Sequence, residues 1–220
     1  MSLRKTFRFV PNALTLGNLL CGVISLMLGQ MEWALIFTAA SLFLDLLDGW
    51  AARWLGATSD IGLQLDSLAD LVSFAVVPAW FVYHLYQGPF GDMALLTGLI
   101  PLAAAWRLAR FNTENSNNEF SGLPSPAAGM FLMSVVFLKL YYPLSFNNYL
   151  SSEGFFLFLV AFTSLSMISQ WKLPSFKSGK TGTLIILIPI ILQLFLSYWS
   201  PLFLVSIVPI YFLSGLVMQR

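Results

Sequence analysis

The sequence predicts an all-α fold, a polytopic bundle of transmembrane helices. Of its 220 residues, 58% are hydrophobic and only 10% are charged, whereas soluble domains carry about 25% charged residues. The mean hydropathy is +0.79. The apolar residues also gather into segments of roughly 17–25 residues, the length that crosses a bilayer as a helix. The net charge of +1 gives no electrostatic footprint for nucleic acid, and the single cysteine, Cys21, excludes an intrachain disulfide.

About eight segments are long and apolar enough to span the membrane. They cover residues 13–29, 32–52, 63–86, 93–110, 125–142, 154–170, 182–198 and 201–218. The polar stretches 112–119 and 172–180 are expected to be loops, because they separate the fourth span from the fifth and the sixth from the seventh. Pro201 is the turn signal that divides the last apolar run into two helices; without this division six or seven spans remain open. No domain boundary is evident, so residues 1–220 are expected to form a single integral membrane domain.

The basic residues favour one orientation of this bundle. With eight spans, ten of the eleven lysines and arginines fall on one side: Arg4, Lys5, Arg8, Arg53, Arg107, Arg110, Lys172, Lys177, Lys180 and Arg220. Only Lys139 is placed toward the other side. Because basic residues accumulate on the cytoplasmic side of membrane proteins, we expect a multi-pass protein with both termini in the cytoplasm.

Four aspartates stand at the ends of two neighbouring spans, on the side predicted to face the cytoplasm. Asp45 and Asp48 lie near the end of the second span, and Asp66 and Asp70 near the start of the third. The spacings i, i+3 and i, i+4 place each pair on one face of its helix. An ionised carboxylate at membrane depth is energetically costly, so four of them facing a common space require cations to compensate their charge.

Carboxylates without a histidine or cysteine companion favour Mg²⁺, Mn²⁺ or Ca²⁺ and argue against zinc. Four of them can hold two divalent ions about 3.5–4 Å apart, as in two-metal phosphoryl-transfer sites. Small residues on the same helices, Gly49, Ala52 and Gly62, would let a bulky ligand approach the backbone. Arg53 adds a permanent cation that suits either phosphate recognition or an ion pair with an aspartate.

Two other interpretations of the aspartates remain open. They could be helix-end charges paired with Arg53, in the way that Asp60 is expected to be a helix cap or a solvated residue. They could also belong to a divalent-cation or proton transporter, because intramembrane carboxylates often mark ion pathways. The clustering of the four at one membrane edge, instead of along several spans, argues against transport.

The two acidic segments carry a resemblance to a known family. They read Asp45-Leu-Leu-Asp48-Gly49-Trp-Ala-Ala52-Arg53, eight residues, then Gly62-Leu-Gln-Leu-Asp66-Ser-Leu-Ala-Asp70. This pattern resembles the signature of the CDP-alcohol phosphotransferase family at every fixed position. Members are membrane enzymes that transfer a phosphatidyl or related group from a CDP-linked lipid to an alcohol and release CMP.

The resemblance implies a role for each motif residue. Asp45, Asp48 and Asp66 would be ligands of two Mg²⁺ or Mn²⁺ ions, and Asp70 would be both a ligand and the catalytic general base. Gly49, Ala52 and Arg53 would lie beside the CDP group, with Asp48 and Gly62 close by. The family core has six spans, so the resemblance divides the chain into a catalytic core of about residues 4–170 and additional C-terminal helices at about 182–218. A homodimer is a further expectation.

Other stretches resemble the prokaryotic members of the family that use serine. They are residues 8–22, 66–79, 107–112 and 120–127. The relatives that make phosphatidylglycerol phosphate have proline and lysine at the positions of Ser67 and Leu71. The resemblance therefore implies transfer from CDP-diacylglycerol to L-serine in a prokaryotic cell membrane, giving phosphatidylserine. Glycerol 3-phosphate or inositol phosphate as the acceptor is the alternative within the family.

A zwitterionic acceptor needs partners for its carboxylate and its ammonium group. Arg107 and Arg110, spaced i, i+3, are the candidates for the carboxylate; the alternative is that they anchor the helix at the membrane surface. Asn112 would contact the ammonium group or cap the helix. Asn12 and Thr15, at the start of the first span, are the candidate contacts to the cytidine.

Overall fold

The computed structural model describes residues 9–86, 91–113, 122–149, 151–171, 205–206 and 208–209. Every regular element in these ranges is helical, which confirms the predicted all-α class. In chain order the elements are α2 (Phe9–Leu28), α3 (Met31–Leu55), α4 (Asp60–Leu71), the π-helical turn η1 (Val72–Val76), α5 (Val77–Leu85), the 3₁₀ helix η2 (Gly91–Gly98), α6 (Leu99–Thr113), α7 (Ser125–Tyr141), α8 (Pro143–Tyr149) and α9 (Glu153–Ile168).

Four helical segments have the length and composition to cross a membrane. They are Phe9–Leu28, Met31–Leu55, Asp60–Leu85 and Asp92–Thr113, and they match the first four predicted spans. The shorter apolar helices Ser125–Tyr141 and Glu153–Ile168 coincide with the fifth and sixth. The predicted spans 182–198 and 201–218 lie outside the described residues, apart from 205–206 and 208–209. A membrane helix bundle is therefore confirmed, and the number of spans stays a prediction.

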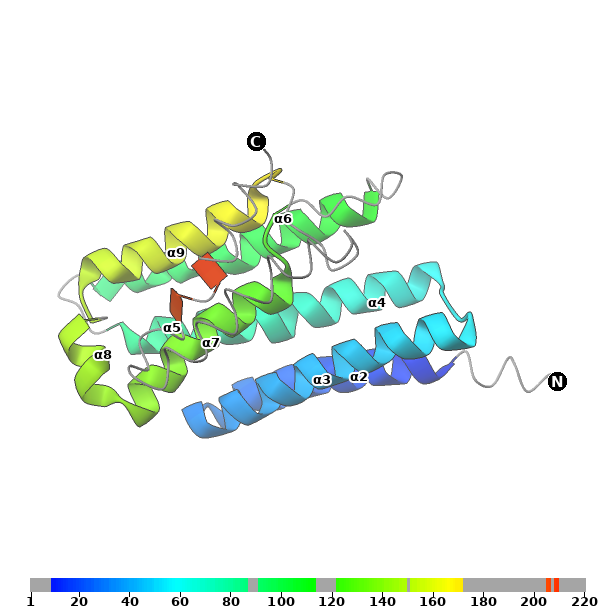
Figure 1. Ribbon diagram of the computed structural model, residues 1–220, viewed down its shortest axis with the longest axis horizontal. Helices are drawn as coiled ribbons and strands as arrows, with labels where there is room; N and C mark the ends of the chain where they lie inside the picture. The colour runs from blue at the N-terminus through cyan, green and yellow to red at the C-terminus, as the bar shows by residue number, and fades with distance from the viewer. Residues whose placement is uncertain are drawn as a thin grey trace, which may run out of the picture.

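The helices form an elongated bundle with α2 and α3 side by side along one edge and α6 and α9 along the opposite edge (Figure 1). α2 packs on both α3 and α4, while α7 packs on α5 and η1. The core between these helices contains the fully buried side chains of Phe74, Phe81 and Phe131. The connection from α3 to α4 lies at one end of the bundle and α8 lies at the other (Figure 1).

A short turn carries the chain from α3 to α4. Gly56 ends α3 in the left-handed region, with φ 57°, and its N–H reaches the carbonyls of the last turn. Ser59 then begins α4 by accepting a hydrogen bond from the Gly62 N–H at 3.0 Å. Because glycine tolerates this backbone conformation, the chain reverses within four residues, and the end of α3 and the start of α4 lie at the same end of the bundle.

The third predicted span is interrupted by η1, where an uninterrupted helix was expected. Pro78 has no N–H to donate to the carbonyl four residues earlier, that of Phe74, so regular α-helical bonding cannot continue through this segment. Two glycines of neighbouring helices lie against the turn. A Cβ at Gly22 of α2 would be 3.2 Å from Ser73 Cα, and one at Gly129 of α7 would be 2.8 Å from the Phe74 carbonyl oxygen.

Candidate active site

The fold brings three of the four aspartates into one cluster. One carboxylate oxygen from each of Asp45, Asp48 and Asp66 lies within 4.8 Å of the others. Asp48 is buried and the other two are half-buried. Three acidic groups at this separation repel one another unless a cation lies between them.

Asp70 lies next to this cluster, about one helical turn further along α4 than Asp66. Its side chain is 8% exposed, and it is close enough to Asp45, Asp66 and Arg107 to interact with them electrostatically. Its Oδ1 atom is buried and has no hydrogen-bond partner among the described residues. Burying an oxygen without a partner is unfavourable, and a bound cation would supply one.

These four carboxylates fit Mg²⁺ or Mn²⁺. The converging atoms are all hard oxygen donors, and no histidine or cysteine is part of the cluster found among the described residues. The buried, unpartnered oxygen of Asp70 adds a fourth donor beside the three that converge. The residues of the predicted metal site are thus together in space, while their role as ligands stays a prediction.

A cavity of about 400 Å³ opens beside the aspartates, between the ends of α2, α3 and α4. Every residue predicted to contact the CDP-lipid lines it: Asn12, Thr15, Asp48, Gly49, Ala52, Arg53 and Gly62. Asp66 lines it as well, so the cavity reaches the aspartate cluster from two helices. The sequence-predicted CDP-lipid residues therefore share one space next to the predicted metal ligands.

The contacts inside this cavity explain why its residues are small or polar. The Thr15 hydroxyl donates to Asp48 Oδ2 at 2.6 Å, which joins α2 to α3 at the metal cluster. A Cβ at Gly49 would lie 3.3 Å from Arg53 Nη1, and one at Gly62 would lie 3.0 Å from Asn12 Oδ1. Larger side chains at either glycine would crowd the polar groups that line the cavity.

The three predicted acceptor residues have different neighbours. Arg107 is buried, interacts electrostatically with Asp70, and donates from Nη1 to Ser125 Oγ at 3.1 Å. Its Nε is buried and has no hydrogen-bond partner in the described part of the chain. Arg107 is therefore a buried cation beside Asp70, while Arg53 lines the cavity with Asp48 and Asp66.

Arg110 and Asn112 instead hold the end of α6 against other helices. Arg110 donates to the carbonyls of Ile168 and Ser169, at 3.0 and 3.2 Å, at the end of α9. Asn112 donates from Nδ2 to Ser67 Oγ at 3.0 Å and to Gln64 Oε1 at 3.3 Å, both on α4. Arg107 and Arg110 therefore have different hydrogen-bond partners, although both lie on α6 at the i, i+3 spacing that had grouped them.

Three polar residues at the site had no contact predicted from the sequence, although Ser67 was noted as a position that differs between relatives. Ser125 holds Arg107 in place, and Gln64 and Ser67 hold Asn112. Ser125 lies within the stretch 120–127 that carries the resemblance, and Ser67 follows a signature aspartate, so both had a sequence signal without an assigned contact. Gln64 had none.

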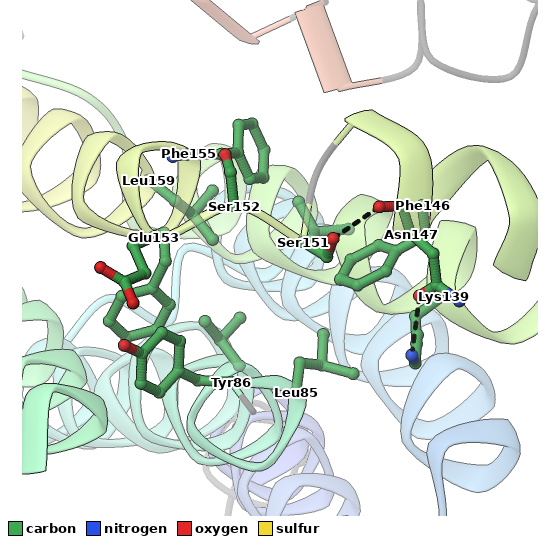
Figure 2. A pocket seen from close by; sticks show the side chains of 13 residues that line it. Leu85, Tyr86, Lys139, Phe146, Asn147, Ser151, Ser152, Glu153, Phe155 and Leu159 are labelled. Atoms are coloured by element: carbon green, nitrogen blue, oxygen red, sulfur yellow. Dashed lines mark hydrogen bonds between the residues drawn. The ribbon is translucent and has the colours of Figure 1, made fainter. Parts of the chain in front are cut away.

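A larger cavity, of about 550 Å³, lies at the other end of the bundle and contains no predicted site residue. Figure 2 shows Tyr86 and Glu153 on one side of it and Lys139, which donates to Asn147 Oδ1 at 3.2 Å, on the other. The segment α4–η1–α5 runs from the aspartates to Tyr86, so the two cavities are a membrane span apart. The signature residues therefore belong to the smaller cavity.

The chain is similar to enzymes of bacteria and an archaeon. A CDP-diacylglycerol–serine O-phosphatidyltransferase of Bacillus subtilis is 38% identical over 176 residues, 77% of this chain and 92% of that protein. The enzyme of the same name from Helicobacter pylori strain 26695 is 33% identical over 192 residues, 84% of this chain and 80% of the relative. The one from Methanocaldococcus jannaschii is 35% identical over 176 residues, 80% of this chain and 78% of the relative.

The match to a family is also broader than the likeness seen in the motifs alone. The pattern that defines the CDP-alcohol phosphatidyltransferases extends over residues 8–213. It therefore includes the two acidic segments, the residues of the cavity beside them, and residues beyond α9, which contain none of the motif stretches given above. This chain belongs to the CDP-alcohol phosphatidyltransferase family.

Proposed function

We propose that the protein transfers the phosphatidyl group of CDP-diacylglycerol to the hydroxyl of L-serine, forming phosphatidylserine and CMP. The observation that carries the proposal is the juxtaposition of the aspartate cluster with a cavity lined by every signature residue for the CDP-lipid. The names of the relatives, which all specify serine, support the choice of acceptor.

The cavity would hold the cytidine and pyrophosphate, with Arg53 supplying positive charge and Asn12 and Thr15 supplying polar contacts. Asp45, Asp48, Asp66 and Asp70 would hold two Mg²⁺ or Mn²⁺ ions, which when bound neutralise the pyrophosphate and stabilise the charge on departing CMP. The membrane end of the cavity would leave the acyl chains in lipid.

In the transfer, the serine hydroxyl oxygen forms a bond to the phosphorus that carries diacylglycerol, and the bond from this phosphorus to the CMP oxygen breaks. The hydroxyl proton goes to a base within hydrogen-bond reach, for which Asp70 is the candidate. Asp70 suits this role because it lies next to the cluster of Asp45, Asp48 and Asp66, and its Oδ1 has no hydrogen-bond partner among the described residues. Direct displacement needs no covalent enzyme intermediate.

Arg107 would bind the carboxylate of serine. It is a buried cation beside Asp70, and its Nε has no hydrogen-bond partner in the described part of the chain. A carboxylate of the acceptor there would compensate the positive charge and accept a hydrogen bond from Nε. Arg110 and Asn112 would contribute by holding the end of α6 in position through their contacts to α9 and α4. Of the three predicted acceptor residues, only Arg107 would then contact serine, and Arg110 and Asn112 would hold α6 in place.

The site would face the cytoplasm. Arg53 ends α3 beside the aspartates, and Arg110 is in the last turn of α6, at the same end of the bundle, whereas Lys139 is in the last turn of α7 at the opposite end. Basic residues gather at the cytoplasmic side of membrane proteins, so this distribution supports the orientation.

The test is CMP release from CDP-diacylglycerol by the purified protein, with serine, ethanolamine, glycerol 3-phosphate and inositol phosphate compared as acceptors. We expect release with serine, dependence on added Mg²⁺ or Mn²⁺, loss with excess EDTA, and no useful replacement by Zn²⁺. A clear preference for glycerol 3-phosphate would refute serine and keep the reaction class. Ion flux in liposomes without any CMP release would refute the enzyme and support a transporter.

A further inference from the structure

The two aspartate helices are held in register through a third helix. α2 packs extensively against both α3 and α4, more than these two pack against each other. The metal cluster nevertheless needs carboxylates from both α3 and α4. The separation between the two aspartate pairs therefore depends on how each helix is fixed to α2.

One backbone atom of α2 receives a hydrogen bond from each side. The carbonyl oxygen of Asn18 accepts from Ser41 Oγ on α3 at 3.1 Å and from Ser73 Oγ in η1 at 3.1 Å. All three residues are at most 1% exposed. Both hydroxyls thus meet at one point in the interior of the bundle, where no water competes for them.

The two serines lie within a helical turn of the aspartates. Ser41 is four residues before Asp45, and Ser73 is three residues after Asp70. A displacement of either serine along or away from α2 would therefore move the neighbouring carboxylate with it, because each serine and its aspartate belong to one continuous helical backbone.

The close approach of the backbones at this point supports the same link independently. A Cβ at Gly22 would lie 2.6 Å from Ser73 Oγ, so only glycine lets η1 come this near to α2. Ser73 is inside the π-helical turn, which changes the direction of side chains relative to a regular helix. Glycine and turn together bring the Ser73 hydroxyl to the Asn18 carbonyl.

We propose that Ser41 and Ser73 are positioning residues that set the distance between the two aspartate pairs through the Asn18 carbonyl. The proposal rests on the proposed function only in taking the aspartates as metal ligands. The two hydrogen bonds act in series, from α3 to α2 and from α2 to η1, so losing either one breaks the link. Magnesium-type sites require near-ideal ligand geometry, so a loosened link should appear first as weaker metal binding.

The experiment measures Mn²⁺ binding by electron paramagnetic resonance, together with thermal unfolding, for Ser41→Ala, Ser73→Ala and the double variant. Each single variant should weaken Mn²⁺ binding by about threefold to tenfold, the range expected for one interhelical hydrogen bond in a membrane protein. The double variant should bind at most about twofold more weakly than the worse single variant, because a series link is broken only once. The matched control is Ser134→Ala, whose hydroxyl donates to the Phe131 carbonyl within α7 at 2.6 Å.

The double variant decides the outcome. If its loss equals the product of the two single losses, the serines act independently and the link is refuted. Unfolding temperatures that fall while Mn²⁺ affinity stays unchanged would also refute it, because the serines would then be structural only. Wild-type protein that binds Mn²⁺ but fails to release CMP with serine would overturn the proposed acceptor and leave this inference standing, provided that the series behaviour is found.

Discussion

Asp70 differs from the other three aspartates in its surroundings. It lies outside the group of three converging carboxylates, has Arg107 as a neighbour, and leaves one buried oxygen without a partner in the described structure. A carboxylate beside the metal ligands that keeps one oxygen available can accept a proton from the hydroxyl of the acceptor.

The substitution Asp70→Asn should therefore separate catalysis from metal binding. We expect serine-dependent CMP release to fall by about 10²–10⁴-fold, the usual contribution of a general base, while Mn²⁺ still binds with reduced affinity. Asp48→Asn, which removes one of the three converging carboxylates, should abolish both CMP release and Mn²⁺ binding. Asp92→Asn, an exposed carboxylate in η2, is the control and should change neither. A loss of less than tenfold at Asp70 would assign the base elsewhere.

The two arginines of α6 should respond differently to the same change. Arg107→Lys keeps the charge but loses the planar fork, so the KM for serine should rise by at least about tenfold if the guanidinium binds the carboxylate. Arg110→Lys should leave that KM nearly unchanged and lower the unfolding temperature, because Arg110 donates to two carbonyls at the end of α9. Steady-state CMP release and thermal unfolding measure the two effects.

Ethanolamine serves as the control for Arg107, since it has the hydroxyl and ammonium groups of serine but no carboxylate. Wild-type protein should use it poorly, and Arg107→Lys should narrow the difference between the two acceptors. If wild-type protein uses both equally well, no carboxylate is being recognised.

At the scale of the helices, the positions of the first six spans could be predicted from hydrophobic segments. The π-helical turn, which lies at close contacts between helices, was not predicted. The first span was predicted at 13–29 and is found at Phe9–Leu28, and the third was predicted at 63–86 and is found at Asp60–Leu85. The apolar composition is continuous through the π-helical turn inside the third span, and Pro78, which was the sequence signal of an interrupted helix, was not used.

The same distinction applies to the candidate site. The aspartates could be grouped in advance because each pair shares a helical face and the two pairs match one signature. The Asn18 carbonyl that joins Ser41 and Ser73 could not, because a backbone acceptor has no sequence signature and depends on how closely three helices approach. Arg110 was grouped with Arg107 by spacing, and α9, which is distant in sequence, supplies its partners.

Gly129 gives the packing of α7 on η1 a direct test. A Cβ there would lie 2.8 Å from the Phe74 carbonyl oxygen and 2.9 Å from Phe74 Cα, which are backbone atoms that cannot move away singly. Gly129→Ala should thus destabilise the protein by about 1–3 kcal/mol through overpacking. Gly154→Ala in α9 is the matched control, because its Cβ would meet nothing within 4 Å and alanine favours a helix by about 0.5–1 kcal/mol.

Thermal unfolding in detergent distinguishes the two glycines. The unfolding temperature should fall for Gly129→Ala and stay the same or rise for Gly154→Ala. Equal effects at both positions would mean that helix propensity, and not the contact with Phe74, determines the result.

At the scale of the whole molecule, the bundle has two chemically different ends. One carries the aspartates, their cavity, Arg53 and Arg107, and the other carries Lys139, Glu153 and the larger cavity (Figure 2). A charged, water-soluble acceptor and the released CMP have to enter and leave at the first end. Serine is available in the cytoplasm, so the direction in which this end faces decides whether the proposed reaction has its substrate.

Cysteine labelling tests that direction in intact cells. The chain has one cysteine, so Cys21→Ala provides a background in which Thr58→Cys, at the aspartate end, and Ser151→Cys, at the other, can be placed singly; both native residues are exposed. A membrane-impermeant maleimide should label Ser151→Cys in intact cells and Thr58→Cys only after the membrane is opened. The reverse pattern would put the aspartates on the outer face, away from cytoplasmic serine, and would refute the predicted orientation whichever acceptor the purified protein uses.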